Sequence, residues 1–262
     1  MKFFEQAFLV FIFSLLFLPL NATQWIKTYA VESYLGPEIY YVHRTKEAGV
    51  EQSGILYGIR LGYERIQRYK LYWGADFLWA KGTLDGKAPD SRLKSVLTDT
   101  NVEARLGYTF QSKYWRCASF TPYIGGGCFW ENNFYQHPSP LPIHFKNHFS
   151  YIPVGFLSQI FITPQCSIGL NIKVRYLLDA YVDVSHDPYH DGVIQHYEKK
   201  LQYRVELPFT YFICWDKCDS LAIGVVSFYE YRPYGHLANF PFDFLETNLE
   251  LCGAIFKILY VF

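Results

Sequence analysis

The stretch SHDPYHDG and the residues after it contain the side chains best suited to chemistry. Four of these side chains lie within six residues and a fifth follows: His186, Asp187, His190, Asp191 and His196. Two histidines four residues apart beside carboxylates can bind zinc, but that spacing aligns ligands on a helix. Pro188 argues against a helix here. The favoured interpretation is therefore a solvated surface loop, and no catalytic, metal or cofactor residue is assigned.

The six cysteines are a second source of chemistry, because an exported chain can form disulfides. Cys214 and Cys218 fall within one short link and make the most inviting bridge. Bridges from Cys117 to either of them, crosslinks to another envelope protein, or a weak zinc site in CWDKC stay open. We expect Cys128 and Cys252 not to pair with each other, because they lie on strands far apart in the predicted order.

The first residues, MKFFEQAFLVFIFSLLFLPLNATQW, predict a cleaved signal peptide that covers residues 1–22. Lys2 precedes an apolar run from Ala7 to Leu20, and small residues stand near Ala22. The run is short for a membrane-spanning helix, which needs about 20 apolar residues. An uncleaved anchor and a buried helix are the alternatives. The mature chain is therefore expected to be exported.

Composition favours strands and disfavours a nucleic-acid partner. Aromatic residues make up 20% of the chain, with 23 Tyr, 23 Phe and 6 Trp, and such residues favour strands. Lys plus Arg equals Asp plus Glu at 24 each, so no overall electric field would attract a polyanion.

Apolar residues recur at every second position in five segments, which is the pattern of strands with unlike faces. These are SGILYGIRLGYERI, RYKLYWGADFLWA, TNVEARLGYTF, CSIGLNIKVRYLLD and LQYRVELPFTYFI. Five weaker strands are expected near 38–45, 121–130, 151–162, 221–232 and 248–262. The sequence therefore predicts an all-β chain of about ten strands, with eight or twelve as alternatives.

Short and long links alternate between these strands. The expected long loops are 81–97, 131–148, 181–199 and 233–247, with a shorter one near KEAGVEQ. Short turns at one end and long loops at the other are typical of transmembrane antiparallel up-and-down β-barrels. A soluble β-barrel or sandwich with its apolar faces inward is the alternative. Aromatic residues at the ends of the apolar faces favour the membrane barrel. We expect residues 23–37 to be a periplasmic lead-in and 38–262 to form the barrel.

The opposite strand faces carry charges of both signs, which we expect to line the lumen. They are Arg60, Glu64, Asp76, Glu103, Arg105, Lys173, Arg175, Arg204, Glu206, Glu230 and Arg232, with Lys70 and Asp179 on the same faces. Buried charges are costly unless they are paired, so interstrand salt bridges are expected. Ten strands enclose little space. The set is therefore interpreted as a structural plug, with a narrow solute path as the alternative.

The chain ends in IFKILYVF, where Phe262, Tyr260, Ile258 and Phe256 occupy alternate positions. This resembles the C-terminal signature of bacterial outer-membrane barrel proteins. The resemblance implies that the last strand closes the barrel and is recognised by the outer-membrane barrel assembly machinery. It also implies location in the bacterial outer membrane, among its lipids.

A closer resemblance is to uncharacterised outer-membrane proteins of chlamydiae and their relatives. It rests on GPEIYYVHRTKEAG, ILYGIRLGYERI, LYWGAD, ELPFTYF and FYEYRPYGHLANFPFDFLETNLELCGAIFKILYVF. This resemblance implies a fold and a location but no reaction.

These observations predict a surface or structural envelope protein, either antigen-like or adhesin-like, with the host surface or other envelope proteins as partners. The first alternative is a narrow channel for small solutes. The distant alternative is a rim hydrolase. Omptin proteases are ten-stranded barrels that use Asp and His at the outer rim, and here only His186 and Asp187 could be nominated. No enzyme activity, cofactor or nucleic-acid partner is expected.

Overall fold

The computed structural model describes residues 29–67, 69–111, 118–163, 165–187, 192–213, 220–235 and 245–261. The expected signal peptide lies outside these ranges, as do His190, Asp191, Cys214, Cys218 and Phe262.

No helix within the described ranges is long and apolar enough to cross a membrane.

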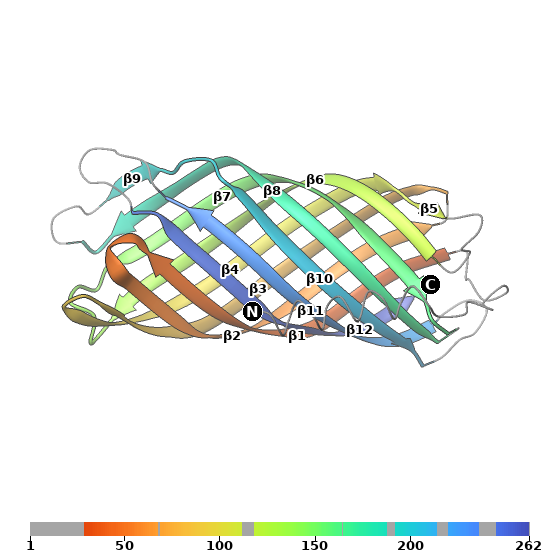
Figure 1. The fold of residues 1–262 in the computed structure, drawn as a ribbon, viewed down its shortest axis with the longest axis horizontal. Helices are drawn as coiled ribbons and strands as arrows, with labels where there is room; N and C mark the ends of the chain where they lie inside the picture. The colour runs from red at the N-terminus through yellow and green to blue at the C-terminus, as the bar shows by residue number, and fades with distance from the viewer. Residues whose placement is uncertain are drawn as a thin grey trace, which may run out of the picture.

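Ten long antiparallel strands form the wall of a barrel in the described part of the chain (Figure 1). They are β1 (Tyr29–Lys46), β2 (Val50–Gln67), β3 (Leu71–Ala88), β4 (Ser91–Tyr108), β6 (Ala118–Gln136), β7 (His144–Phe161), β8 (Cys166–Ser185), β10 (Leu201–Phe212), β11 (Ser220–Tyr234) and β12 (Thr247–Val261). Two short strands, β5 (Phe110–Gln111) and β9 (Val193–His196), and the 3-10 turn η1 (Glu47–Gly49) complete the elements.

The strands run up and down in chain order, and the sheet closes on itself. β8 pairs with β10 beside the short β9, and β5 pairs with β6. β12 pairs with β1 from Lys46↔Thr247 to Glu32↔Val261, which removes the last open edge. Closure satisfies the backbone hydrogen bonds without any unpaired edge strand. The predicted ten-stranded antiparallel barrel is confirmed.

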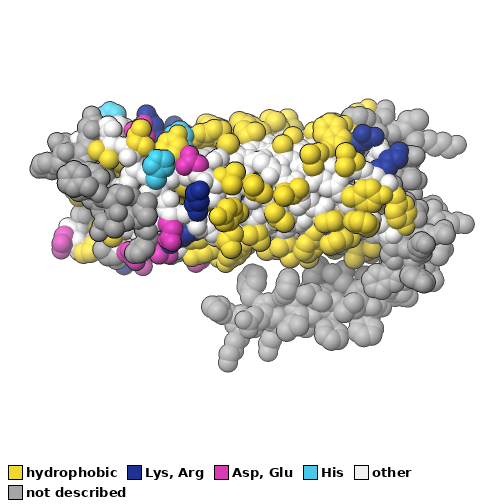
Figure 2. Space-filling view, turned by 90° about the horizontal axis from the view of Figure 1, so that it is seen from above, with side chains coloured by type: hydrophobic (Ala, Val, Ile, Leu, Met, Phe, Trp, Pro, Cys, Tyr) yellow, Lys and Arg dark blue, Asp and Glu magenta, His cyan; other side chains and the backbone are white. Residues whose placement is uncertain are grey.

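The two faces of each strand have different surroundings. In β2, Ile55, Ile59 and Leu61 point outward and are 45%, 49% and 43% exposed, whereas Leu56 and Arg60 point inward and are buried. On the face that Figure 2 shows, the outward apolar side chains form a belt between the two ends of the barrel, with acidic and histidine side chains at one end and Lys or Arg side chains at both ends. An apolar outer belt around a polar interior is the arrangement of a barrel that spans a lipid bilayer.

We call the end where β1 begins and β12 finishes the terminal end, and the opposite end, which carries η1 and β9, the hairpin end (Figure 1). Outward aromatic side chains pack in pairs at both ends of the apolar faces. Tyr63 and Trp73 have ring centroids 4.7 Å apart, and Tyr203 and Tyr231 have centroids 5.3 Å apart. Amphipathic rings at such positions suit the two membrane interfaces.

The first strand is longer than the sequence pattern predicts. β1 begins at Tyr29, so residues 29–37, which were expected to be a periplasmic lead-in, are part of the barrel wall. Glu32 and Tyr34 point inward and Leu35 points outward, so the alternation extends to this segment. Pro37 argued against a strand across this segment, because proline is unusual within strands, so the strand was expected to begin only after it.

Two of the expected long loops, 81–97 and 131–148, are a misinterpretation, because most of their residues are strand. β3 continues to Ala88 and β4 begins at Ser91, so the predicted loop 81–97 is a hairpin with only residues 89–90 between its strands. The segments around 131–148, 181–199 and 233–247 likewise contain strand residues. Beyond the belt the outward side chains are polar, as at Lys81 and Asp85. The contrast between the two faces that marked the other strands is therefore lost there.

A β-bulge changes the face of β8. Ser150 of β7 pairs with Asp179, whereas Tyr151 pairs with Leu177, so Leu178 is an extra residue on β8. Asp179, expected in the lumen, consequently faces outward and is exposed. Lys70, also expected in the lumen, is exposed in the turn between β2 and β3.

Candidate functional site

The structure places all eleven charged residues of the predicted lumen set inside the barrel. Nine of them are buried: Arg60, Asp76, Glu103, Arg105, Lys173, Arg175, Arg204, Glu230 and Arg232. The side chains of Glu64 and Glu206 are 13% and 15% exposed and still take part in ion pairs. Alternation positions them, because each lies on the inward-facing parity of its strand.

Eight of the buried charges form a closed ring of alternating sign inside the barrel, which we call the charge ring. In order around the lumen they are Arg60, Asp76, Arg105, Glu103, Arg175, Glu230, Arg204 and Glu38, which returns to Arg60. The nitrogen–oxygen distance is 2.6 Å in the Arg60–Asp76 contact and 3.8 Å in the Arg204–Glu38 contact. Seven strands contribute, so the ring ties opposite sides of the barrel together.

Further charges branch from the ring. Glu64 contacts Arg105 at 2.8 Å, Lys173 contacts Glu103 at 2.6 Å, and Glu206 contacts Arg204 at 2.5 Å. Another branch consists of Arg232, which contacts Glu230 at 2.5 Å and both Asp99 and Glu131 at 3.0 Å.

Three carboxylates of this network were missed at the level of sequence: Glu38, Asp99 and Glu131. Glu38 is the first residue of its expected strand, and Glu131 falls in an expected loop. Parity could have identified Asp99, since it continues the inward series that contains Glu103 and Arg105.

Aromatic rings cover the arginines of the network. The guanidinium carbon of Arg204 lies 3.9 Å from the ring centroid of Phe228. The corresponding distances are 4.9 Å for Arg175 over Tyr151 and 5.0 Å for Arg232 over Phe129. A desolvated cation gains most from such a face, so the rings help offset the cost of burying these charges.

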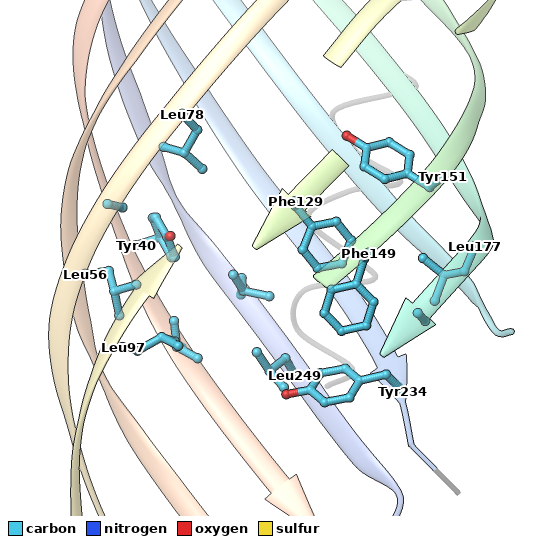
Figure 3. Close-up of a cluster of buried hydrophobic side chains, with 14 of the residues drawn as sticks. Tyr40, Leu56, Leu78, Leu97, Phe129, Phe149, Tyr151, Leu177, Tyr234 and Leu249 are labelled. Atoms are coloured by element: carbon cyan, nitrogen blue, oxygen red, sulfur yellow. The ribbon is translucent and has the colours of Figure 1, made fainter. Parts of the chain in front are cut away.

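Next to the network, large apolar side chains fill the interior in what we call the aromatic plug (Figure 3). Phe129 and Phe149 stack with centroids 4.2 Å apart. Tyr234 lies 5.3 Å from Phe149 and 5.4 Å from Tyr197. All four are at most 4% exposed. This plug was not predictable from the sequence, because phenylalanines on the inward parity of glycine-rich or loop-like stretches gave no clear alternation.

The histidine loop is only partly described. His186 has a positive φ of 63°, and its ring lies 6.4 Å from that of His144. A different pair, His196 Nδ1 and Asp179 Oδ1, approaches to 3.5 Å on the exposed outer wall. The β-bulge that turns Asp179 outward creates this pair. Within the described ranges no cluster of three or more His, Cys, Asp or Glu side chains is arranged to hold a metal ion.

The closing strand faces outward with the residues of the C-terminal signature. Phe256, Ile258 and Tyr260 are 49%, 62% and 48% exposed on the outside of β12. Among the cysteines with a described environment, Cys128, Cys166 and Cys252 are free thiols.

No family model matches the sequence, and no curated protein matches it either. Solved structures do resemble the barrel. The outer-membrane protease OmpT from Escherichia coli superposes with a TM-score of 0.55 at 9% identity, over 92% of this chain and 99% of that one. The β domain of the Bordetella autotransporter BrkA gives a TM-score of 0.42 at 9% identity, over 88% and 99% of the two chains. The translocator domain of NalP from Neisseria meningitidis gives 0.38 at 7% identity, over 96% and 97%.

At such identities, the likeness to OmpT concerns the fold alone. Together with the closed sheet and the outer apolar belt, it establishes that this chain has the fold of a bacterial outer-membrane β-barrel.

Proposed function

We propose that this chain is a structural, surface-displaying protein of the bacterial outer membrane, with an antigen-like or adhesin-like role. The observation that carries the proposal is the filled lumen. The charge ring joins seven strands across the interior, and the aromatic plug fills the space beside it.

A filled lumen favours a structural role over transport. If one charged side chain of the ring moves away, its partners are left as buried, unpaired charges. Breaking one buried ion pair in this way costs about 3–5 kcal/mol. Each ring arginine contacts at least two carboxylates; Arg60, for example, contacts Glu38 and Asp76 at 2.6 Å each. A solute path would have to open several such contacts at once.

Planar-bilayer recording tests this proposal against the narrow channel. The purified protein, inserted from detergent, is expected to give no reproducible unit conductance, while a known porin inserted in parallel does. A reproducible unit conductance that scales with protein concentration would contradict the structural role and favour the channel.

The hairpin end is the surface that such a protein would display, with the terminal end in the periplasm. The β3–β4 hairpin carries exposed polar side chains at Lys87 and Asp90. Trypsin added to intact cells should cut beside Lys87, and a Lys87→Gln variant should resist that cut. Cleavage only after the outer membrane is permeabilised would reverse the orientation.

A rim hydrolase is the second candidate, and the His196–Asp179 pair at 3.5 Å is the observation that favours it. OmpT, whose fold this chain shares, is a protease. Protease and lipase assays on the wild type, His196→Ala and His186→Ala would decide. Hydrolysis that is lost in either variant but not in His43→Ala would support the second candidate.

Other features complete the proposal. We propose residues 1–22 as a signal peptide and the segment that ends at Phe262 as the one recognised by the assembly machinery, and a bridge between Cys214 and Cys218 is one of the pairings that stay open. We also propose that the chain is related to the outer-membrane proteins of chlamydiae. N-terminal sequencing of protein from the membrane fraction should begin near residue 23. Mass spectrometry without reduction should show whether Cys214 and Cys218 are joined.

A further inference from the structure

A pocket lies at the hairpin end of the barrel, between the start of β4 and the hairpin that joins β6 to β7. Its volume is about 170 Å³. Its walls include Leu93 of β4, Tyr135 of β6, Phe145 of β7, and Ser139, Leu141 and Ile143 of the connecting segment. None of the described residues that line it is charged. The pocket therefore differs in kind from the charge ring.

The walls of the pocket are held in place by specific contacts. The Ser139 hydroxyl accepts a hydrogen bond from the backbone nitrogen of Lys94 and donates one to its carbonyl oxygen, both at 2.8 Å. These two bonds fix the connecting segment against β4. The Tyr135 ring meets the Phe145 ring edge on, with centroids 5.8 Å apart, and Phe145 also packs against the aromatic plug. The pocket is therefore formed before any ligand arrives.

The polar groups of the wall are already engaged, so water gains little by entering the pocket. The Ser139 hydroxyl is bound to Lys94, and the Tyr135 hydroxyl donates to the side-chain oxygen of Gln52 at 3.0 Å. A buried water needs two to four polar partners, whereas the rest of the wall is hydrocarbon. A cavity of about 150 Å³ lined by Leu, Ile and Phe stays dry and binds benzene. The same physical conditions hold in this pocket.

The size and lining of the pocket define the class of ligand. Pockets for drug-sized molecules measure about 300–1,000 Å³, so this pocket is limited to about one ring. The rings of Tyr135 and Phe145 favour an aromatic ligand, because aromatic pairs gain from edge-to-face contacts. A charged ligand would lose its hydration without gaining a partner. Leu141 is 38% exposed, so a small molecule can reach the pocket from outside the barrel.

We propose that this pocket binds a neutral hydrocarbon with a single aromatic ring, of about the size of benzene. Tyr135 and Phe145 contact the ring of the ligand, and Leu93 and Leu141 enclose it. The site lies at the end that is proposed to face the surroundings of the cell, but ligand binding does not depend on the protein's structural role.

Equilibrium dialysis with radiolabelled benzene tests the proposal on the full-length barrel in detergent. The same detergent without protein measures how much benzene enters the micelles. The wild type should show one saturable site per chain above that background, and unlabelled benzoate, which carries a charge, should not compete for it.

Two variants change the pocket in different ways. Leu141→Asp places a carboxylate at its exposed edge and should weaken binding at least tenfold. Leu93→Trp fills the pocket and should abolish saturable binding. Leu245→Asp is the matched control, because Leu245 is also 38% exposed at the hairpin end but does not line the pocket. It should bind benzene like the wild type.

Altered mobility on heating in a denaturing gel confirms that each variant has folded. The absence of a saturable site in the folded wild type would overturn the proposal. Unchanged binding by folded Leu141→Asp would also overturn it, and so would an equal loss in Leu245→Asp, since the benzene would then be held elsewhere. Competition by benzoate would contradict the assignment of a neutral ligand.

Discussion

Three arginines contact Glu230, a carboxylate of the charge ring, so its neutralisation should destabilise the barrel. It is fully buried and contacts Arg175, Arg204 at 2.6 Å and Arg232 at 2.5 Å. In Glu230→Gln the shape is kept, but three guanidiniums lose a charged partner in a site that water does not reach. Removal of one partner from a buried pair costs about 3–5 kcal/mol.

The expected loss lies at the lower end of that range, about 3 kcal/mol, because every affected arginine retains another carboxylate. Arg204 keeps Glu206 at 2.5 Å, and Arg232 keeps Asp99 at 3.0 Å. At 1.4 kcal/mol per tenfold, such a loss changes the ratio of folded to unfolded protein about 100-fold.

Urea unfolding in lipid vesicles, followed by tryptophan fluorescence, measures this loss as a lower midpoint with an unchanged slope. Glu250→Gln is the matched control, because Glu250 lies on the adjacent strand β12, pairs with Tyr231 and is exposed. An exposed substitution of this kind should change stability by less than about 0.5 kcal/mol. If both variants lose stability within about 0.5 kcal/mol of each other, the ring is not a stabilising element and the reasoning fails.

Three further predictions concern other parts of the barrel. Gly36→Ala places a Cβ 1.6 Å from the carbonyl oxygen of Phe256, so it should weaken the β1–β12 pairing and lower the free energy of unfolding by about 3 kcal/mol. Gly126→Ala is the control, because its Cβ enters open space, and it should fold normally. Altered mobility on heating in a denaturing gel reports the folding of both variants, and equal folding would contradict the register of β1 against β12. Ile59→Arg should cost about 2–4 kcal/mol in vesicles, because it puts a charge in the outer belt, and a cost near zero would mean that this face meets water. Phe149→Ala should lower the free energy of unfolding by about 3–5 kcal/mol, because it removes a ring stacked in the aromatic plug. The variant should still give no conductance, because the charge ring remains intact. A current in the bilayer assay would show that the aromatic plug alone closes the lumen.

For the candidate site, the sequence predicted which charged residues face the lumen but not which residues they pair with. Parity along single strands placed charges such as Arg60 and Arg204 inside, and the cost of burial implied that they pair. Their actual partners did not follow, because the Arg60–Glu38 contact depends on the register of β1 against β2, and the Arg175–Glu103 contact crosses the lumen from β8 to β4. Cross-lumen distances depend on barrel diameter and strand tilt, which no local pattern contains.

Alternation in five segments, together with five weaker ones, predicted that the chain is all-β with about ten strands and that the clearest strands have one charged face and one apolar face. These are local properties, because successive side chains on a strand must point to opposite sides. Tertiary structure decided that β1 begins at Tyr29, that the hairpins extend beyond the belt, and that a bulge turns Asp179 outward. It also decided that the charges join into one ring beside a plug of aromatic rings. These features depend on how distant strands are staggered and on what each side chain meets across the barrel, which only the closed sheet establishes.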